Sequence, residues 1–466
     1  MTEFSNAHQS KTFRFAITCF VSLVSFGLMA TRDIRADVKL PSVLNSHMVL
    51  QRDMPIPVWG WAAAGEKVTI TIGASSATAT ADVDGKWKVS LPAMQADGKT
   101  HSLKVVGNNT VTLEDILIGD VWVGSGQSNM EWQLRNTNGA AEAIDAAQYP
   151  EIRLFHVKKV QKKEPADDVE VTAHWARCTP KSVPAFSGVL YYFGRKVHEE
   201  VDVPVGLINS SWGGSPIEPW TVTDKSSGGM YNGMIAPLQP FGVRGTIWYQ
   251  GETNVIRKNG LAYFDKTKDL VEGWRKTWNS ELPFYFVQIA PWSGAQYEAG
   301  QLPALWEAQT ASLKLPRTGM AVTTDLVDNI ADIHPRNKLD VGNRLARWAL
   351  AKTYGMQDIV YSGPLFRSMK VDGKSIRIEF AHAAGGLKTR DNAPLSEFQV
   401  AGADGKFVDA EAKIDGQSVL VSSPEVAEPK NVRFGWHKLA TPNLVNSEGL
   451  PASPFQTNNW QGGTGE

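Results

Sequence analysis

The chain has 466 residues, of which 42% are hydrophobic and 20% are charged, and its formal net charge is -1. A chain of this length exceeds the size at which single hydrophobic cores stop growing, so two or three domains are expected. The near-zero net charge provides no field to attract nucleic acid or an anionic membrane surface, and the prediction excludes both as partners.

The first 36 residues have the pattern of an export signal. Lys11 and Arg14 precede the apolar stretch 15–30, and the segment ends at the small residue Ala36. The stretch is short for a membrane span and is interrupted by Ser, Thr and Cys, which is typical of a secretory signal. The sequence therefore predicts a signal peptide at 1–36 and an exported protein, periplasmic or extracellular, that is free of the membrane after cleavage. The alternative is an uncleaved anchor.

The two cysteines indicate that no disulfide holds the mature chain together. Cys19 lies inside the predicted signal, so Cys178 is alone after cleavage. A single cysteine cannot form an intramolecular disulfide, and we expect the chain to tolerate an oxidising compartment without using it.

Residues 37–115 read as a small β-sandwich module. Short runs of alternating apolar and polar residues, such as VTITIG and SATATADV, are separated by the turn signals DGK and GNN. Alternation of this kind over runs of about six residues is typical of strands with one buried face.

The pattern changes in residues 116–355, where apolar strands alternate with helix-like stretches. The strands are predicted at 120–124, 152–157, 203–210, 245–251, 283–290 and 319–324. Strands interleaved with helices indicate a parallel sheet covered on both faces, and so an α/β catalytic domain. Residues 356–466 again show short runs with the pattern of strands, and they are predicted to form a β-rich C-terminal segment.

The stretch GSGQSNM at 124–130 follows the first of these strands directly. Gly124 and Gly126 permit backbone angles closed to other residues, so the strand can turn sharply and present Ser128 at an exposed corner. A nucleophile belongs in such a place. The alternative is that Ser128 only caps the helix that follows.

Ligands of open parallel sheets bind beyond the carboxyl ends of the strands, so the loops at those ends are where chemistry is expected. Besides GSGQSNM, three loops stand out: SSWGGSP at 210–216, QGETN at 250–254 and DNIADIHPRNK at 328–338. Together they supply the groups that acyl transfer requires. The chain thus predicts one active site assembled from four loops.

Each loop has a predicted role in that site. Ser128 would attack, His334 would accept its proton, and Asp332 would orient the imidazole ring. The backbone amides of Ser128 and Gly214 and the side-chain amide of Gln250 would form the oxyanion hole.

Simpler explanations exist for each of these residues. The WGG stretch could be only a tight turn, and Gln250 and Glu252 could satisfy loop backbone groups. His334 could be a loop residue, although it follows the last long strand, where hydrolases with a doubly wound sheet place their base. The other histidines show no pair at metal-ligand spacing, so neither a metal site nor a cofactor is predicted.

The motifs carry a family resemblance across nearly the whole mature chain. GQSNMEWQ, LINSSWGGSPIEPW, IWYQGETN and ADIHPRNK resemble the sialate O-acetylesterase family of SGNH hydrolases, as do LPSVLNSHMVLQRDMPIPVWGWAAAGEKV and GLPASPFQT near the two ends. The resemblance implies a flavodoxin-like three-layer α/β/α domain and hydrolysis of acetyl esters on carbohydrates without a metal cofactor. It further implies Ser128 as the nucleophile and His334 as the base.

The sequence departs from the general SGNH pattern at the base. The superfamily writes this block as Asp-x-x-His, whereas here Ala331 stands at the Asp position and Asp332 lies two residues before His334. Residues two apart in an extended segment project to the same side, which lets Asp332 approach the ring. Otherwise a backbone carbonyl, Asp328 or Glu252 could hold the ring, or the site could work as a Ser-His dyad.

The superfamily also uses an Asn as an oxyanion donor in its third block. The comparable loop here offers Gln250, which is the predicted donor, with Asn254 as the second choice. Glu252, Asn254 and Trp212 are predicted to contact the substrate. Tryptophan rings are common platforms for sugars, and the further candidates are Trp132, Trp292 and Trp306.

The predicted function is therefore that of an exported serine esterase that removes O-acetyl groups from carbohydrates, as a sialate O-acetylesterase. The motifs also fit an acetylesterase of plant cell-wall polymers such as xylan or xyloglucan. From a different class, a non-catalytic exported glycan-binding protein would use the β-modules and a dead hydrolase core. The sequence leaves the oligomeric state open.

Overall fold

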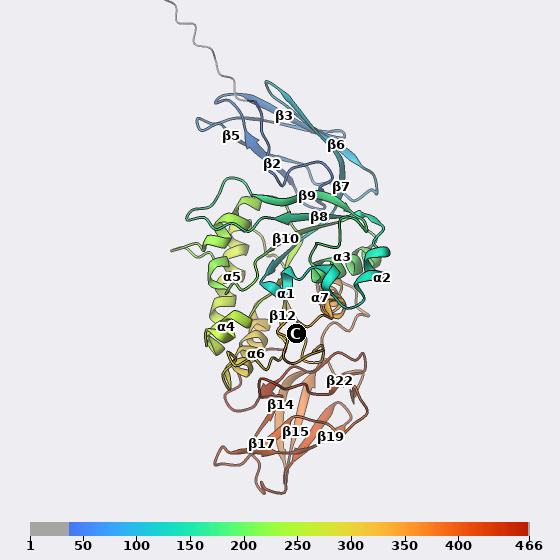
Figure 1. Ribbon diagram of the computed structural model, residues 1–466, viewed down its shortest axis with the longest axis vertical. Helices are drawn as coiled ribbons and strands as arrows, with labels where there is room; N and C mark the ends of the chain where they lie inside the picture. Colours follow the sequence, from blue (N-terminus) through green and yellow to red (C-terminus); the bar gives the residue numbers. More distant parts are fainter. Residues whose placement is uncertain (1–36, 465–466) are drawn as a thin grey trace, which may run out of the picture. The chain divides into compact units, whose positions relative to one another are not determined.

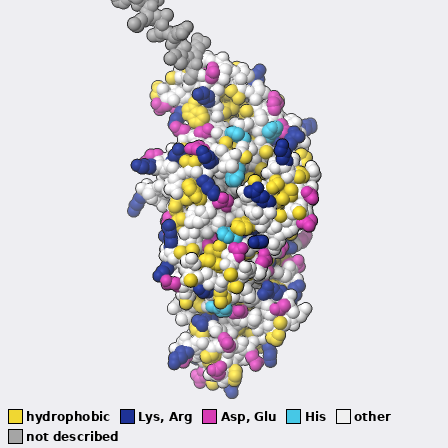
Figure 2. All heavy atoms as spheres, in the orientation of Figure 1, with side chains coloured by type: hydrophobic (Ala, Val, Ile, Leu, Met, Phe, Trp, Pro, Cys, Tyr) yellow, Lys and Arg dark blue, Asp and Glu magenta, His cyan; other side chains and the backbone are white. Residues whose placement is uncertain are grey.

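The computed structural model describes residues 37–464, and Figure 1 shows the elements in chain order. The signal peptide predicted at 1–36 lies outside the described residues. Within 37–464, no helix combines the length and the apolar character needed to cross a membrane. On the face shown in Figure 2, basic and acidic side chains are interspersed, in keeping with the net charge of -1.

The segment that follows residue 37 consists of short strands. They are β1 (Val49–Gln51), β2 (Ile56–Trp61), β3 (Lys67–Ile72), β4 (Ser75–Thr80), β5 (Lys86–Leu91) and β6 (His101–Val106). Successive side chains of β2 and β3 alternate between buried and more exposed positions, as the sequence pattern predicted. β3 pairs with β4 and β6, while β2 pairs with β5.

One strand, β7 (Thr110–Gly126), connects this segment to the central sheet. Its first half pairs with β6 and alternates in burial, whereas every residue from 116 to 126 is buried. Continuous burial is typical of a central strand covered on both faces. The boundary predicted after residue 115 therefore falls inside a single strand.

The central sheet has the strand order β13-β12-β11-β7-β10-β8-β9. Its further members are β8 (Tyr149–Val157), β9 (Val171–Cys178), β10 (Val205–Ser211), β11 (Gly245–Tyr249), β12 (Phe284–Gln288) and β13 (Thr318–Val322). All neighbours pair in parallel except β9, which runs antiparallel to β8 at one edge. The predicted parallel sheet is thus confirmed, and the antiparallel edge strand makes it mixed.

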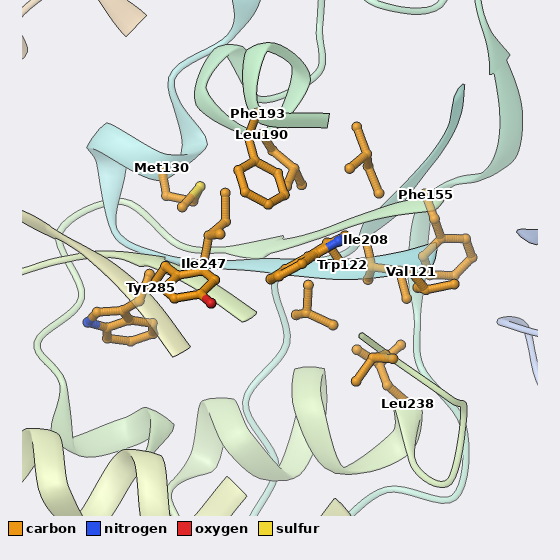
Figure 3. Packing of buried hydrophobic residues seen from close by; sticks show 14 of the residues in the cluster. Val121, Trp122, Met130, Phe155, Leu190, Phe193, Ile208, Leu238, Ile247 and Tyr285 are labelled. Carbon is orange, nitrogen blue, oxygen red and sulfur yellow. The ribbon is translucent and has the colours of Figure 1, made fainter. Parts of the chain in front are cut away.

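Helices cover both faces of this sheet. They are α1 (Ser128–Glu131), α2 (Ala140–Asp145), α3 (Gly188–Val201), α4 (Glu252–Ile256), α5 (Tyr263–Trp278), α6 (Gln301–Ala311) and α7 (Lys338–Lys352). On one face Phe193 of α3 meets Trp122 of β7 edge-on at 4.9 Å, and Figure 3 shows it reaching from the helix toward the sheet. On the other face Trp274 of α5 meets Trp248 of β11 edge-on at 6.3 Å. Edge-to-face packing of buried aromatic rings is favourable beyond the area that it buries.

The C-terminal part again consists of strands and has its own hydrophobic core. The strands are β14 (Leu365–Asp372), β15 (Ser375–Ala381), β16 (Leu387–Thr389), β17 (Phe398–Ala401), β18 (Phe407–Asp409), β19 (Glu411–Asp415), β20 (Ser418–Ser422), β21 (Asn431–Phe434), β22 (Leu444–Asn446) and β23 (Phe455–Gln456). They form two four-stranded sheets and one two-stranded sheet. Phe398, Phe434 and Phe455 stack in sequence between the larger sheets, with ring centroids 4.5 and 5.7 Å apart.

Candidate active site

The ends of three central strands meet at one point of the sheet. Gly126, the last residue of β7, lies opposite Ser211 of β10 and Tyr249 of β11. Gly126 has φ 134°, and a Cβ there would approach the Tyr249 carbonyl oxygen to 2.2 Å. Only glycine fits this turn. The loops that follow the three strands therefore start side by side, as the sequence predicted for ligand-binding loops.

Ser128 faces the imidazole ring of His334. The distance from Ser128 Oγ to His334 Nε2 is 2.8 Å. Gln127 stands at the N-cap position of helix α1 without a side-chain capping bond, and Ser128 is the first helical residue, so the interpretation of Ser128 as the helix cap is wrong. A serine hydroxyl in hydrogen-bond reach of an imidazole can transfer its proton to the ring, which is how a serine becomes a nucleophile.

A tryptophan supports the His334 ring from the side. The rings of Trp132 and His334 are stacked with centroids 4.7 Å apart and planes inclined by 20°. Trp132 was predicted as a possible sugar contact, and the structure instead places it against the imidazole. Its indole Nε1 donates to the carbonyl of Asn136, which fixes the plane of the ring.

Asp332 contacts His334 in two ways through one oxygen. Asp332 Oδ1 accepts a hydrogen bond of 2.9 Å from the backbone N–H of His334, and the same oxygen lies 3.5 Å from His334 Nδ1. The first contact is the loop-capping role that aspartate often has. The second is at the long limit of a hydrogen bond, so the carboxylate acts on the ring mainly through its charge. Asp328 instead accepts from Asn138 and the Arg336 backbone.

The pKa of His334 is lowered below its ordinary value of 6.5. Burial is the largest cause because it disfavours the charged ring, and the positive charge of Lys338 adds to it. The negative charge of Asp332 acts in the opposite direction and does not outweigh these effects. The ring is therefore neutral, and able to accept a proton, at a lower pH than an exposed histidine.

We expect the pH dependence of esterase activity to follow this shift. The active form carries a neutral His334, so kcat/KM rises as the ring loses its proton, and the midpoint lies below pH 6.5. Initial rates of p-nitrophenyl acetate hydrolysis between about pH 4 and pH 8, corrected for background hydrolysis, measure the profile. A midpoint above pH 6.5, or no rise, contradicts the environment described for His334.

The WGG loop places Gly213 beside Ser128. A Cβ at Gly213 would stand 3.4 Å from Ser128 Cβ, and Gly214 has φ 75°, a conformation that favours glycine. The Gly213 N–H donates to Glu131 Oε2 at 2.7 Å. Within residues 37–464, the backbone N–H groups of Ser128 and Gly214 donate to no other group. Both N–H groups are thus free to donate, and their role in the oxyanion hole stays a prediction.

The structure corrects the third predicted oxyanion donor. Gln250 is fully buried, and its side-chain N–H groups donate to Gln127 Oε1 at 3.0 Å and Asn254 Oδ1 at 2.7 Å. Its carbonyl oxygen accepts from the Tyr263 hydroxyl at 2.7 Å. An amide whose groups are already used inside the protein has none left for the substrate. Gln250 therefore holds the QGETN loop on Gln127 rather than donating to an oxyanion.

Two of the three predicted substrate contacts are also corrected. Asn254 is fully buried, and its Nδ2 donates to Asn259 and Glu218, so it serves neither as a substrate contact nor as the second-choice oxyanion donor. Glu252 is 2% exposed and lies beneath the site. Trp212 is partly buried and lines a cavity of about 550 Å³ together with Gly214, which keeps it a candidate.

A second cavity, of about 390 Å³, lies next to His334. It is lined by His334, Asp332, Asp328, Asn138 and Arg336, among others. The first cavity lies at the WGG loop and the second at His334, and each is of a size that could receive part of a sugar. The other tryptophans named from the sequence line neither cavity: Trp306 is fully buried, and the Trp292 indole donates to the Ala331 carbonyl.

Sequence reasoning missed several residues of the site. Gln127, Asn129 and Glu131 flank the nucleophile, and each contacts a different loop. Lys338 is fully buried at the first turn of α7. The sequence did contain a signal for the three residues around Ser128. Amide and acidic side chains crowd the turn that directly follows a buried strand, and such side chains must find hydrogen-bond partners inside the protein.

The described residues also bear on the prediction that the site holds no metal ion. Within residues 37–464, no group of three or more His, Cys, Asp or Glu side chains is arranged to hold one. Cys178 is buried and unpaired.

Comparisons with known proteins identify the family of the chain. The family model of carbohydrate esterases described as sialic acid-specific acetylesterases matches residues 118–351. Sialate O-acetylesterase of Homo sapiens is 31% identical over an alignment of 395 residues, and the match covers 72% of this chain and 75% of that protein. The enzyme of the same name from Mus musculus is 30% identical over an alignment of 360 residues, and that match covers 61% of this chain and 66% of that protein.

A solved structure is similar over a larger part of the chain. A carbohydrate acetylesterase from Xanthomonas citri is 38% identical, covers 91% of this chain and 100% of its own, and superposes with a TM-score of 0.87. The match includes the central sheet and the segments on either side of it, since less than a tenth of this chain lies outside it. From the family model, the relatives and this structure together, the chain belongs to the sialic acid-specific acetylesterase family of carbohydrate esterases and is a carboxylic ester hydrolase.

Proposed function

We propose that the chain is a serine esterase that removes O-acetyl groups from carbohydrates, as a sialate O-acetylesterase, through an acyl-enzyme on Ser128. The observation that carries the proposal is the contact of 2.8 Å between Ser128 Oγ and His334 Nε2 at the carboxyl end of the central sheet. The helices on both faces of that sheet support a flavodoxin-like α/β/α arrangement of the SGNH type.

The reaction proceeds in two halves. Ser128 Oγ attacks the acetyl carbonyl carbon while His334 Nε2 takes the hydroxyl proton, and the backbone amides of Ser128 and Gly214 stabilise the oxyanion. The intermediate collapses, and the sugar oxygen leaves with the proton from His334. Water then gives a proton to His334 and attacks the acetyl-Ser128 ester, after which acetate departs and Ser128 regains its proton.

Asp332 supports His334 in this scheme. The variant Asp332→Asn, which removes the negative charge of the side chain, measures how much that support contributes to kcat. Asp332→Asn retains an oxygen that can accept from the His334 backbone, so the loop is expected to keep its shape. Because the carboxylate is 3.5 Å from Nδ1, kcat should fall by much less than the ~10⁴-fold known for a fully hydrogen-bonded triad aspartate. Loss of the negative charge lowers the pKa of His334 further, so the rise of kcat/KM with pH moves to lower pH.

The measurement is a pH profile of kcat and KM for Asp332→Asn beside the native protein. A loss near 10⁴-fold would assign Asp332 to a full triad. A profile shifted to higher pH would contradict the electrostatic role.

The acetylated sugar is the finer part of the proposal. The human relative is named for sialate, whereas the relative from Xanthomonas citri, which covers more of this chain, is described as a carbohydrate acetylesterase. For this reason esters of plant cell-wall polymers are kept as the second candidate. Acetate release from 9-O-acetyl sialic acid, acetylated xylan and acetylated xyloglucan under the same conditions decides between them. Release from the polymers alone would overturn the sialate assignment.

We also propose that the chain is exported through the signal at 1–36. The basic residues before the apolar stretch and the small residue at its end support this proposal. N-terminal sequencing of the protein recovered from periplasm and medium should find a chain that starts near Asp37. A chain that keeps its first 36 residues in the membrane fraction would support the anchor instead.

A further inference from the structure

A buried polar cluster lies directly beneath the catalytic pair. It consists of Asn129 of α1, Glu252 of α4 and Lys338 of α7, with 1%, 2% and 0% of their surfaces exposed. Asn129 Nδ2 donates to Glu252 Oε1 at 2.6 Å, and Lys338 Nζ donates to Asn129 Oδ1 at 2.5 Å. One amide thus bridges a carboxyl group and an amine that come from different helices.

The two neighbours fix the orientation of the Asn129 amide. The charged amine of Lys338 can only donate to the Asn129 oxygen, so the amide nitrogen must face the other way, toward Glu252. In this orientation Nδ2 also donates to the backbone carbonyl of Ile333 at 3.1 Å. The reverse orientation would place donor against donor on the Lys338 side. The cluster therefore determines where the amide of Asn129 points.

The bond from Asn129 to Ile333 joins the two halves of the catalytic pair. Asn129 directly follows Ser128, and Ile333 directly precedes His334. One partly buried hydrogen bond thus links the turn that carries Ser128 to the loop that carries His334. A shift of that loop would change the distance between Ser128 Oγ and His334 Nε2, on which proton transfer depends.

Lys338 adds a charge to this geometry. Its Nζ lies 5.2 Å from the ring centroid of Tyr249, and the acidic groups that act on it are Glu252, Asp332 and Asp328. Burial lowers the pKa of Lys338 to about 7, and burial raises that of Glu252, whose Oε2 has no hydrogen-bond partner. Below that pH the amine is charged, and its charge repels a proton on the ring of His334.

We propose that Asn129, Glu252 and Lys338 act as a positioning cluster: Asn129 holds the base loop on the nucleophile turn, and Lys338, whose amine donates to Asn129, places its positive charge beneath the Ser128–His334 pair. Burying an amine without a direct carboxylate partner is unfavourable for folding, so stability alone does not explain Lys338. Perturbed ionisable groups of this kind gather at functional sites. The inference rests on the proposed function, because it assigns the cluster to the Ser128–His334 pair.

The experiment compares Asn129→Ala and Lys338→Met with the native protein in kcat, KM and the pH profile of p-nitrophenyl acetate hydrolysis. Asn129→Ala releases the base loop, and kcat should fall by about 10²-fold with KM nearly unchanged, as expected when reacting groups are displaced by about 1 Å. Lys338→Met removes the repelling charge, so His334 keeps its proton to a higher pH and the rise of kcat/KM moves to higher pH.

Arg344→Met is the matched control, since Arg344 is also a cation buried in α7. It pairs with Asp325 at 2.6 Å and has no part in the proposed mechanism. Arg344→Met should lower the unfolding temperature and leave the pH profile in place. If Lys338→Met does not fold, the double variant Lys338→Met with Glu252→Gln removes both charges and should show the same shift to higher pH.

The outcomes separate the two proposals. If the native protein hydrolyses the ester no faster than Ser128→Ala, the proposed function fails. Two results with an active native protein would overturn the positioning cluster alone. One is an Asn129→Ala variant that keeps more than half of the native kcat. The other is a pH profile of a folded Lys338→Met, or of the double variant, that coincides with the native profile.

Discussion

Ser128→Ala lowers kcat by about 10⁶-fold, the loss known for removal of the nucleophile from a serine hydrolase. Without Oγ no acyl-enzyme can form, and the remaining site contributes only binding and the oxyanion donors. The variant should fold as the native protein does, because Ser128 does not cap α1 and its hydroxyl contacts only His334. Acetate release and p-nitrophenyl acetate hydrolysis measure the loss, and thermal unfolding checks the fold.

Ser125→Ala is the matched control for this experiment. Ser125 precedes Ser128 by three residues and lies in β7. It is fully buried, and its hydroxyl has no hydrogen-bond partner. Removal of an unpaired buried hydroxyl leaves no partner unsatisfied, so stability and kcat should both stay near native values. Equal rates for native protein and Ser128→Ala, with both folded, would favour the non-catalytic glycan-binding alternative.

The central sheet could be predicted because its strands are short apolar runs separated by helical stretches. The six runs named from the sequence correspond to β7, β8, β10, β11, β12 and β13. β9 was missed because it is an edge strand with several exposed residues, which gives it no continuous apolar run. The length of β7 was also missed, since its two halves carry two different burial patterns.

The main parts of the site could be predicted for a different reason. The rule that ligands bind beyond the carboxyl ends of parallel strands selected the loops that contain Ser128, Gly214 and His334. The strand register brings the loops that contain Ser128 and Gly214 together. His334 follows β13 at the edge of the sheet, and its contact with Ser128 Oγ joins the third loop to them. A serine, a glycine amide and an imidazole are the groups that acyl transfer requires, which is why these loops were selected.

The roles of the amide side chains could not be predicted from the sequence. Gln250 and Asn254 carry the donors that an oxyanion hole requires. However, the Gln250 amide donates to Gln127, which is 123 positions away in the sequence, and the Asn254 amide donates to Glu218. An amide can donate or accept in either direction, and only the surrounding partners decide which. The two residues were therefore correctly placed near the site, but Gln250 was wrongly assigned to the oxyanion hole and Asn254 wrongly assigned to the substrate.

The turn that follows β7 organises the rest of the site. Gln127 Oε1 accepts from the Gly251 and Thr253 amides of the QGETN loop, and Asn129 holds the base loop through Ile333. Glu131 Oε2 accepts from the WGG loop at Gly213. Three polar side chains around the nucleophile thus each fix one of the loops. Because buried polar groups must be paired, the same bonds that satisfy them determine the geometry of the site.

His334→Ala is expected to reduce kcat about as much as Ser128→Ala, by about 10⁶-fold, because nucleophile and base act as one unit. Without the ring, the Ser128 hydroxyl has no acceptor for its proton, and Asp332 Oδ1 is held by the loop backbone rather than placed to receive it. The rise of kcat/KM below pH 6.5 should disappear from the residual rate, since that rise reports the ionisation of His334. The decisive measurement is the double variant Ser128→Ala with His334→Ala, which should be no slower than either single variant. If the two losses multiplied instead, or if His334→Ala kept most of the native kcat, the two residues would not share one proton transfer, and another group would have to serve as the base.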